Sequence, residues 1–329
     1  MISGVPNIQK KQDSYIFEYP EYIDAANQQL EIFWPWNEID VAKDKQELLT
    51  SMTESEKHGV TTALKLFTKY EIIVGNEYWL GRVMRMFPKP DIQRMAVAFG
   101  NTEINSHAPF YNEINSELGL ATEEFYSSYI EDETLVSRME FIESLVSSKD
   151  DVLSLAGFSI VEGAILYSSF AFLKHFQSNG KNKLLNICRG INMSVTDENL
   201  HSIGGAALCL DLKRELEYTE EEEKAFGEEV YSLCDKVREH EYRIVEMLFE
   251  KGNMSGITDI QMKHFVDSRI NTCLQQLGLK SKYEVKYNPI ADWFYKGINN
   301  YQFNDFFSGI GREYKRGWKE SKFTWGSNV

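Results

Sequence analysis

The stretch Asp197-Glu198-Asn199-Leu200-His201 decides how this chain of 329 residues folds. Glu198 and His201 are three residues apart in a helix-compatible run, so a carboxylate and an imidazole project from one helix face. An earlier run repeats the pairing, with Glu103 and His107 four residues apart. Each pair supplies half of a metal site, because carboxylate oxygens and imidazole nitrogens are metal ligands.

Two further carboxylates fall inside apolar segments. Glu162 is the single acid between residues 152 and 176, where an unpaired buried charge would be very costly. Glu71 lies in another apolar helical pattern, in which Glu77 is the alternative ligand. Acids and histidines spread in this way over four long helices are typical of ferritin-like proteins that hold two metal ions. The sequence therefore predicts an all-α, ferritin-like bundle with a di-metal carboxylate site in a four-helix core.

Local signals place the expected helices. Thr53 and Thr219 each begin a capping-box pattern, and Pro88 and Pro90 separate the first core helix from the second. Strand signals are nearly absent, which supports the all-α class. The expected helices cover residues 53–87, 91–118, 122–146, 150–176, 183–216, 219–252 and 258–278.

Length and composition predict one structural domain with three parts. Residues 1–50 show no sustained periodicity, but their aromatic residues, Trp34 among them, predict an ordered arm packed on the core. Residues 51–279 form the helical domain. Residues 280–329 are aromatic and basic with scattered glycine, and are expected to be an irregular segment that ends in a flexible tail.

Charge and cysteine content narrow the class of protein. A net charge of −15 argues against a nucleic-acid partner held through its phosphates. The four cysteines form no CxxC pair and are expected to be reduced thiols. No apolar run is expected to reach the length of a membrane span, so the protein is predicted to be soluble and cytoplasmic. The remaining histidines are expected at the surface or in satisfied core positions, and the charged stretch Arg238–Glu241 is expected to be solvated.

Four segments carry a resemblance to a known family: Phe33-Trp34 followed by Glu38–Asp44, Phe99–Glu103 with His107 and Tyr111, Asp197–His201, and Gly311–Gly317. Together, and in this order, they resemble the small, radical-generating subunit of class I ribonucleotide reductase over nearly the whole chain. The resemblance implies a di-metal site that is activated by oxygen or an oxygen-derived oxidant. The resulting radical would pass to a large catalytic subunit that reduces ribonucleoside diphosphates or triphosphates to deoxyribonucleotides.

The resemblance also implies particular roles. Two iron ions are expected, with manganese/iron and manganese/manganese as alternatives that the sequence does not separate. A homodimer is expected, and the carboxy-terminal tail would dock on the large subunit. Radical transfer would begin at the metals and His107, continue through Asp197 and Trp34, and reach Tyr314 on the tail. The implied metal ligands are Glu71, Glu103, His107, Glu162, Glu198 and His201.

One spacing departs from the family. The family usually separates the second-helix Glu and His by three residues, whereas Glu103 and His107 are four apart. An inserted residue is normally absorbed as a π-bulge, and Pro109 already frees the carbonyl of Asn105, so we predict a widened turn between about residues 103 and 109. The first ligand departs as well, since Glu71 stands where the family commonly has Asp.

The inserted residue also leaves two candidates for the radical position. Counted from His107 the radical tyrosine is Tyr111, which we favour because the insertion precedes His107. Counted from Glu103 the same place falls on Phe110, and the oxidant would then be stored on a manganese/iron pair. The pocket around the radical is expected to be apolar, with Leu166 and Phe170 on the Glu162 helix.

Two other functions remain as alternatives. The first is a ferritin-like di-iron oxidase that acts directly on a small substrate or lipid, which would need neither Trp34 nor Tyr314. The second is a metal-storage or structural bundle, for which an aromatic arm and a long tail are superfluous. Both the arm and the tail motifs favour the radical-generating subunit.

Overall fold

The computed structural model describes residues 4–297, apart from the side chains of residues 68, 69, 129, 130 and 297. Within this range the regular elements are helices, and an isolated bridge between Met254 and Ile257 is the sole β-pairing. The all-α prediction is confirmed for the described chain. The predictions made for the tail, including Tyr314, lie outside the described residues.

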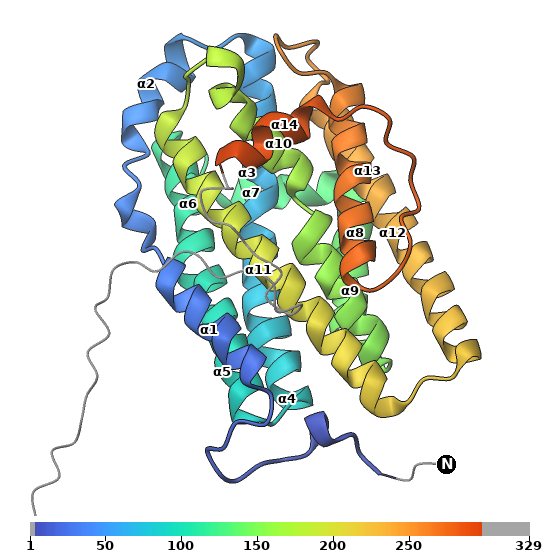
Figure 1. Ribbon diagram of the computed structural model, residues 1–329. Helices are drawn as coiled ribbons and strands as arrows, with labels where there is room; N and C mark the ends of the chain where they lie inside the picture. Colours follow the sequence, from blue (N-terminus) through green and yellow to red (C-terminus); the bar gives the residue numbers. More distant parts are fainter. Residues whose placement is uncertain (1–3, 298–329) are drawn as a thin grey trace, which may run out of the picture.

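Four helical segments form the core of the bundle (Figure 1). The first and second contact each other where α3 meets α6 and η3 meets α5, and α9 runs along α11. Each segment carries at least one of the predicted metal ligands. The segments are α3 (Glu54–Ile72) with η3 (Ile73–Val83) and α4 (Met84–Met86); α5 (Pro90–Thr102) with η4 (Glu103–His107) and α6 (Ala108–Glu117); α9 (Asp151–Ala164) with α10 (Tyr167–Lys174); and α11 (Leu185–Leu216).

The remaining helices cover this core. The long helices α12 (Glu220–Leu248) and α13 (Asp259–Gln276) pack on α9, as does α8 (Glu133–Val146). Amino-terminal α1 (Pro20–Ile32) lies along α5 and α11 (Figure 1), α2 (Ala42–Thr50) contacts α11, and α14 (Pro289–Phe294) rests on α10 and α13. The short elements are η1 (Asn7–Gln9), η2 (Trp36–Glu38), α7 (Glu123–Ser127), η5 (Ser128–Glu131), η6 (His175–Gly180) and η7 (Tyr295–Gly297).

The predicted capping boxes are present at the starts of α3 and α12. Thr53 accepts a hydrogen bond from the backbone of Glu56, whose carboxylate accepts from the backbone of Thr53 in return. Thr219 and Glu222 make the same reciprocal pair. Each box satisfies two backbone donors that a helix start leaves free, which fixes the beginning of the helix.

The expectation that residues 1–50 lack periodic structure was wrong. This segment contains α1 and α2, and α1 buries Tyr22, Ala25, Ala26 and Gln29. These positions have helical spacing, but two alanines and a glutamine give little hydrophobic contrast with the exposed face, so the period is weak in the sequence. Trp34, which follows α1, is 2% exposed, and the described part of the arm therefore lies against the bundle.

Two expected boundaries were also wrong. The helix expected over residues 122–146 is interrupted, because Asp132 accepts from the backbone of Thr134 and Leu135 and so starts α8 anew. The carboxy-terminal segment, expected to be irregular from residue 280, contains α14. Asn288 caps this short helix, and Pro289 occupies its first turn.

The helix expected over residues 150–176 is broken beside a predicted metal ligand. Ile165 is extended and Leu166 has a φ of 71°, so α9 ends two residues after Glu162 and α10 begins at Tyr167. A left-handed conformation costs a residue with a side chain roughly 1–2 kcal/mol, and it persists only where the surroundings hold it. Neither proline nor glycine marks positions 165 and 166, so the local sequence does not announce the break.

The charged stretch expected to be solvated is partly buried instead. Glu241 is 0% exposed and pairs with Arg138 of α8 at 2.9 Å, while His240 is 5% exposed. The expectation failed because the partner of Glu241 lies about a hundred residues away in the sequence. A buried carboxylate needs such a partner to remain charged.

Among the described residues, one stretch, Asp151–Gly180, is long and apolar enough to cross a membrane by length and composition. This corrects the expectation that no run reaches that length. The apolar window is entirely buried inside the protein, and the break at Leu166 interrupts it. The stretch is thus the central helix pair of the bundle.

Candidate metal centre

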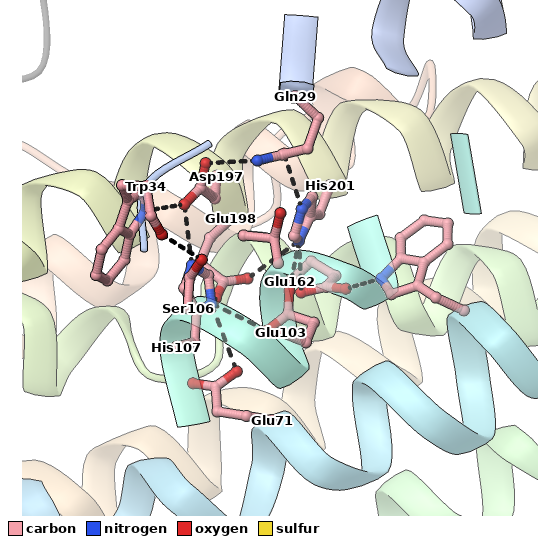
Figure 2. Close-up of polar contacts among 12 residues, drawn as sticks. Gln29, Trp34, Glu71, Glu103, Ser106, His107, Glu162, Asp197, Glu198 and His201 are labelled. Carbon is pink, nitrogen blue, oxygen red and sulfur yellow. Dashed lines mark hydrogen bonds and ion pairs between the residues drawn. The ribbon is translucent and has the colours of Figure 1, made fainter. Parts of the chain in front are cut away.

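The six predicted ligands converge in the middle of the four-helix core (Figure 2). They form two groups, and within each group the ligand atoms lie within 4.8 Å of one another. All six side chains are buried, and both groups contain the carboxylates of Glu103 and Glu198. This is the arrangement expected of two neighbouring ions that share two carboxylates. The groups are Glu71, Glu103, His107 and Glu198, and Glu103, Glu162, Glu198 and His201.

Widened helical turns bring the first group together. The π-turn predicted between residues 103 and 109 is confirmed as η4, Glu103–His107. It absorbs the extra residue, so that His107 Nδ1 lies 2.9 Å from a Glu103 oxygen although the two residues are four apart. A second π-stretch, η3, was not predicted and begins at Ile73, two residues after Glu71. A Cβ at Gly75 of η3 would lie 3.0 Å from Glu103 Cβ, so glycine permits the close approach of η3 to η4 beneath the site.

The exposure of the two candidates for the first ligand differs. Glu71 is 2% exposed and belongs to the cluster, with an oxygen 3.7 Å from His107 Nδ1. Glu77 is exposed at the surface of η3. The geometry therefore favours Glu71, the residue that the sequence reading preferred.

The cluster leaves buried polar atoms without hydrogen bonds. Glu71 Oε1, Glu103 Oε1 and His201 Nδ1 are all buried and unbonded, although the last two lie only 2.6 Å apart. Such atoms are rare in proteins, since most buried polar groups are paired. Four carboxylates would carry a charge of −4 when ionised, which two divalent cations would neutralise. The donor set fits two metal ions with mainly oxygen ligands and one imidazole each, which suits iron or manganese better than zinc.

Burial and mutual repulsion make the carboxylates hard to ionise. Burial raises the pKa of Glu71 well above its usual value, and the neighbouring Glu103 adds to the effect. Burial and the charge of Glu198 likewise raise the pKa of Glu162. The pKa of Glu198 rises to about 8, through burial first and Glu103 second. Burial also raises the pKa of Glu103, but the charges of His107 and His201 outweigh it and hold that pKa well below the usual value.

Hydrogen bonds extend from the cluster to the predicted arm. Asp197 Oδ2 lies 3.0 Å from His107 Nε2 and accepts a hydrogen bond of 2.8 Å from the indole N–H of Trp34. Ser106 Oγ donates to the carbonyl of Trp34 and so holds its backbone. His107, Asp197 and Trp34 therefore form a continuous chain of polar contacts, which Figure 2 shows.

Two residues that the sequence reading missed complete the surroundings. Gln29 of α1 donates to Asp197 Oδ1 at 2.8 Å and lies with its carbonyl oxygen 3.1 Å from His201 Nε2. Trp79 donates its indole N–H to Glu162 Oε1 at 2.6 Å. A buried indole requires an acceptor, so Trp79 could have been singled out within its apolar helix. Gln29 gives little signal, because the helical pattern of α1 is weak in the sequence.

Tyr111 and Phe110 occupy different surroundings. The Tyr111 ring stacks on Phe67 at 4.3 Å and lies 6.4 Å from the His107 ring. Burial raises the pKa of Tyr111, and the charge of Glu71 raises it further. Phe110 packs edge-on against Trp34 at 5.5 Å, and a side chain at Gly190 of α11 would overlap its ring.

One of the two residues expected in the apolar pocket beside the radical position, Phe170, belongs to the same aromatic stack as Tyr111. Phe170 stacks on Phe67 at 5.2 Å, which makes a column of Tyr111, Phe67 and Phe170. Leu166 is 6% exposed and lies at the break between α9 and α10. One face of the Tyr111 ring is thus covered by the ring of Phe67.

The bundle and its buried carboxylate cluster define a ferritin-like protein with a site for two metal ions. The family model described as "Ribonucleotide reductase, small chain" matches residues 12–289. The chain belongs to this family. It is therefore the small, radical-generating subunit of a ribonucleotide reductase, an oxidoreductase component that works with a large subunit. A di-metal oxidase that acts directly on a substrate is not favoured.

Individual relatives agree with this assignment. The chain is 23% identical over 333 residues to a probable ribonucleoside-diphosphate reductase small subunit of Invertebrate iridescent virus 3, covering 94% of this chain and 85% of the relative. It is 23% identical to the ribonucleoside-diphosphate reductase subunit beta of Haemophilus influenzae, covering 83% and 80%. Its fold is similar to that of dimanganese(II)-NrdF from Streptococcus sanguinis, with a TM-score of 0.76 at 20% identity, covering 88% and 99%.

Metal loading is expected to release protons. Because the pKa values of Glu71, Glu162 and Glu198 are raised, the metal-free cluster retains protons at pH 7, and cations must displace them. Metal affinity should then rise with pH by roughly tenfold per unit for each proton displaced. The measurement is proton release on adding Mn(II), together with affinity between pH 6 and 9. The exposed Glu77→Gln variant serves as a control that should match the wild type, and an affinity independent of pH would contradict the account.

Proposed function

We propose that the six clustered residues bind two metal ions and that Tyr111 stores the oxidant of this small subunit. The observation that carries the proposal is the pair of four-residue groups sharing Glu103 and Glu198, with the Tyr111 ring 6.4 Å from that of His107. When bound and reduced, the ions supply a one-electron oxidant after reaction with oxygen or an oxygen-derived oxidant. The other roles, which are to orient the ligands, to store the radical and to transfer protons and electrons, are assigned to side chains of this chain.

The surrounding hydrogen bonds orient the proposed ligands. An N–H at His107 Nε2 faces Asp197 and one at His201 Nε2 faces Gln29, which leaves the Nδ1 lone pair of each ring directed into the cluster. Trp79 occupies one oxygen of Glu162, so the other is available to a cation. Glu103 and Glu198 would be shared between the ions.

The pocket of Tyr111 suits storage of a radical. Its ring is 0% exposed and stacks on Phe67, and neither that ring nor Phe170 offers a proton or an easily removed electron. Phe110 points towards Trp34, which favours Tyr111 over Phe110 at the radical position. A dry pocket prolongs the life of a phenoxyl radical because water and reductants are excluded.

The chain of hydrogen bonds from His107 supports the proposed transfer route. When the Tyr111 phenoxyl radical takes an electron from Trp34, the resulting phenolate takes back the proton that the phenol gave up to the cluster when the radical formed. The indole proton of Trp34 moves along the 2.8 Å hydrogen bond to Asp197. The proton returns when Trp34 is reduced again by Tyr314, which lies outside the described residues. The electron thus moves inwards while the oxidising equivalent moves outwards to the large subunit.

The finer assignments of metal and partner are also proposals. We assign two iron ions, with manganese/iron and manganese/manganese as alternatives that the same oxygen-rich set would accept. We assign docking on the large subunit to the tail within residues 280–329 and place the protein in the cytoplasm as a homodimer. Residues 1–50 would act as the arm, and residues 51–279 would act as the metal-binding domain.

Replacement of Tyr111 tests the site of radical storage. After iron loading and exposure to oxygen, the wild type should give a tyrosyl electron paramagnetic resonance signal, and Tyr111→Phe should lose it while keeping its metal content. The matched control is Tyr78→Phe, which removes another fully buried phenol and should keep the signal. A tyrosyl signal that survives in Tyr111→Phe would contradict the assignment. Turnover without any tyrosyl signal would favour storage on the metals.

Replacement of Trp34 tests the transfer route. Trp34→Phe removes the indole N–H bonded to Asp197 and should abolish turnover with the large subunit, while metal content and the tyrosyl signal persist. Tyr314→Phe should behave in the same way. Trp36→Phe, a partly buried neighbour in η2, is the matched control. Unaltered turnover in Trp34→Phe or Tyr314→Phe would remove that residue from the route.

A further inference from the structure

The break between α9 and α10 opens backbone groups close to a proposed metal ligand. The α9 helix ends at Ala164, two residues after Glu162, and the left-handed Leu166 turns the chain before α10 restarts. Carbonyls at the end of α9 and amides at the start of α10 therefore lose their intrahelical partners. Buried groups of this kind need partners from elsewhere in the protein.

Two side chains from neighbouring helices supply those partners. Arg269 of α13 donates from Nε and Nη2 to the carbonyl of Gly163, at 3.0 and 2.8 Å. Glu241 of α12 accepts from the backbone N–H groups of Leu166 and Ser168, at 3.4 and 3.3 Å. Gly163 adjoins Glu162, so the guanidinium of Arg269 holds the part of the backbone that carries the ligand.

The close approach of α13 leaves little freedom at this point. A side chain at Gly163 would overlap Cys273 of α13 and Ser202 of α11. Arg269 itself is 3% exposed, and its guanidinium lies 4.0 Å from the centre of the Tyr167 ring at the start of α10. Arg269 therefore contacts both sides of the break.

The same guanidinium also binds the carboxy-terminal strap, which we define as Pro289–Gly297. Arg269 Nη1 donates to the hydroxyl of Tyr295 at 3.0 Å. The preceding residue, Phe294, packs against Phe265 of α13 at 4.7 Å and lies 4.4 Å from Lys174 Nζ. The strap is thus seated on α10 and α13 and lies within residues 280–329, the segment to which docking on the large subunit is assigned.

We propose that Arg269 is a positioning residue that couples the seating of the strap to the position of Glu162. The proposal rests on the function proposed above, because it takes Glu162 to be a metal ligand. Metal binding fixes Glu162 and the adjoining Gly163 carbonyl, which orders Arg269 and through it Tyr295. Coupling between two sites is reciprocal, so engagement of the chain beyond the strap would in turn alter the metal site.

Hydrogen exchange of the strap tests the coupling in the full-length chain. Backbone amides of residues 290–297 are compared without metal and with two equivalents of Mn(II), and the metal content is measured on the same samples. In the wild type, metal should slow exchange by about fivefold or more. In Tyr295→Phe, which removes only the hydroxyl that accepts from Arg269, the slowing should shrink to about twofold or less.

Two further variants separate coupling from general stability. Arg269→Lys keeps the charge but loses the forked contact with Gly163 and Tyr295, and should also lose the metal-dependent slowing. Tyr287→Phe, at a position 64% exposed, should behave as the wild type. Tyr295→Phe keeps the test valid if Arg269→Lys does not fold.

The outcomes distinguish the coupling from the proposed function. Equal exchange with and without metal in a wild-type protein that holds two ions would overturn the coupling alone. Slowing that persists undiminished in Tyr295→Phe would do the same. Failure of the wild type to bind Mn(II) would overturn the proposed metal site together with the coupling.

Discussion

The burial of four carboxylates in the interior of a helical bundle is the constraint on which the rest of this structure depends. Unpaired charges are very costly in such a place, and the two imidazoles alone do not balance them. Two divalent cations would balance this charge, and the surrounding contacts are consistent with the binding of cations. Asp197 and Gln29 contact the Nε2 atoms of His107 and His201, which face away from the cluster. Trp79 binds one oxygen of Glu162 and leaves the other oxygen free to face the cluster.

The irregular parts of the backbone concentrate at the same place. The π-turn at Glu103–His107 brings a glutamate and a histidine onto one face despite their unusual spacing, and the π-stretch after Glu71 approaches it closely at Gly75. The break at Leu166 follows Glu162 closely. Distortions of this kind are costly unless the surroundings hold them, and functional sites are where proteins retain them.

The clustering of these residues was predictable because local sequence determines which helix face a residue occupies. Glu198 and His201 share a face by spacing, and Glu162 was conspicuous as a lone acid in an apolar helix. The π-turn was predictable only because the family spacing exposed an inserted residue. Gln29, the break at Leu166 and the buried pair of Arg138 with Glu241 were not predictable, since each depends on partners 75 to 172 residues away.

The central claim is that the six buried side chains hold two metal ions, and anomalous scattering tests it most directly. Crystals of the metal-loaded protein should show two peaks in anomalous difference maps collected at the iron and manganese edges. One peak should lie between Glu71 and His107, and the other between Glu162 and His201, with Glu103 and Glu198 shared. The relative strength at the two edges would also identify the metals. Maps without a peak in this cluster, from protein loaded with iron and manganese, would contradict the account.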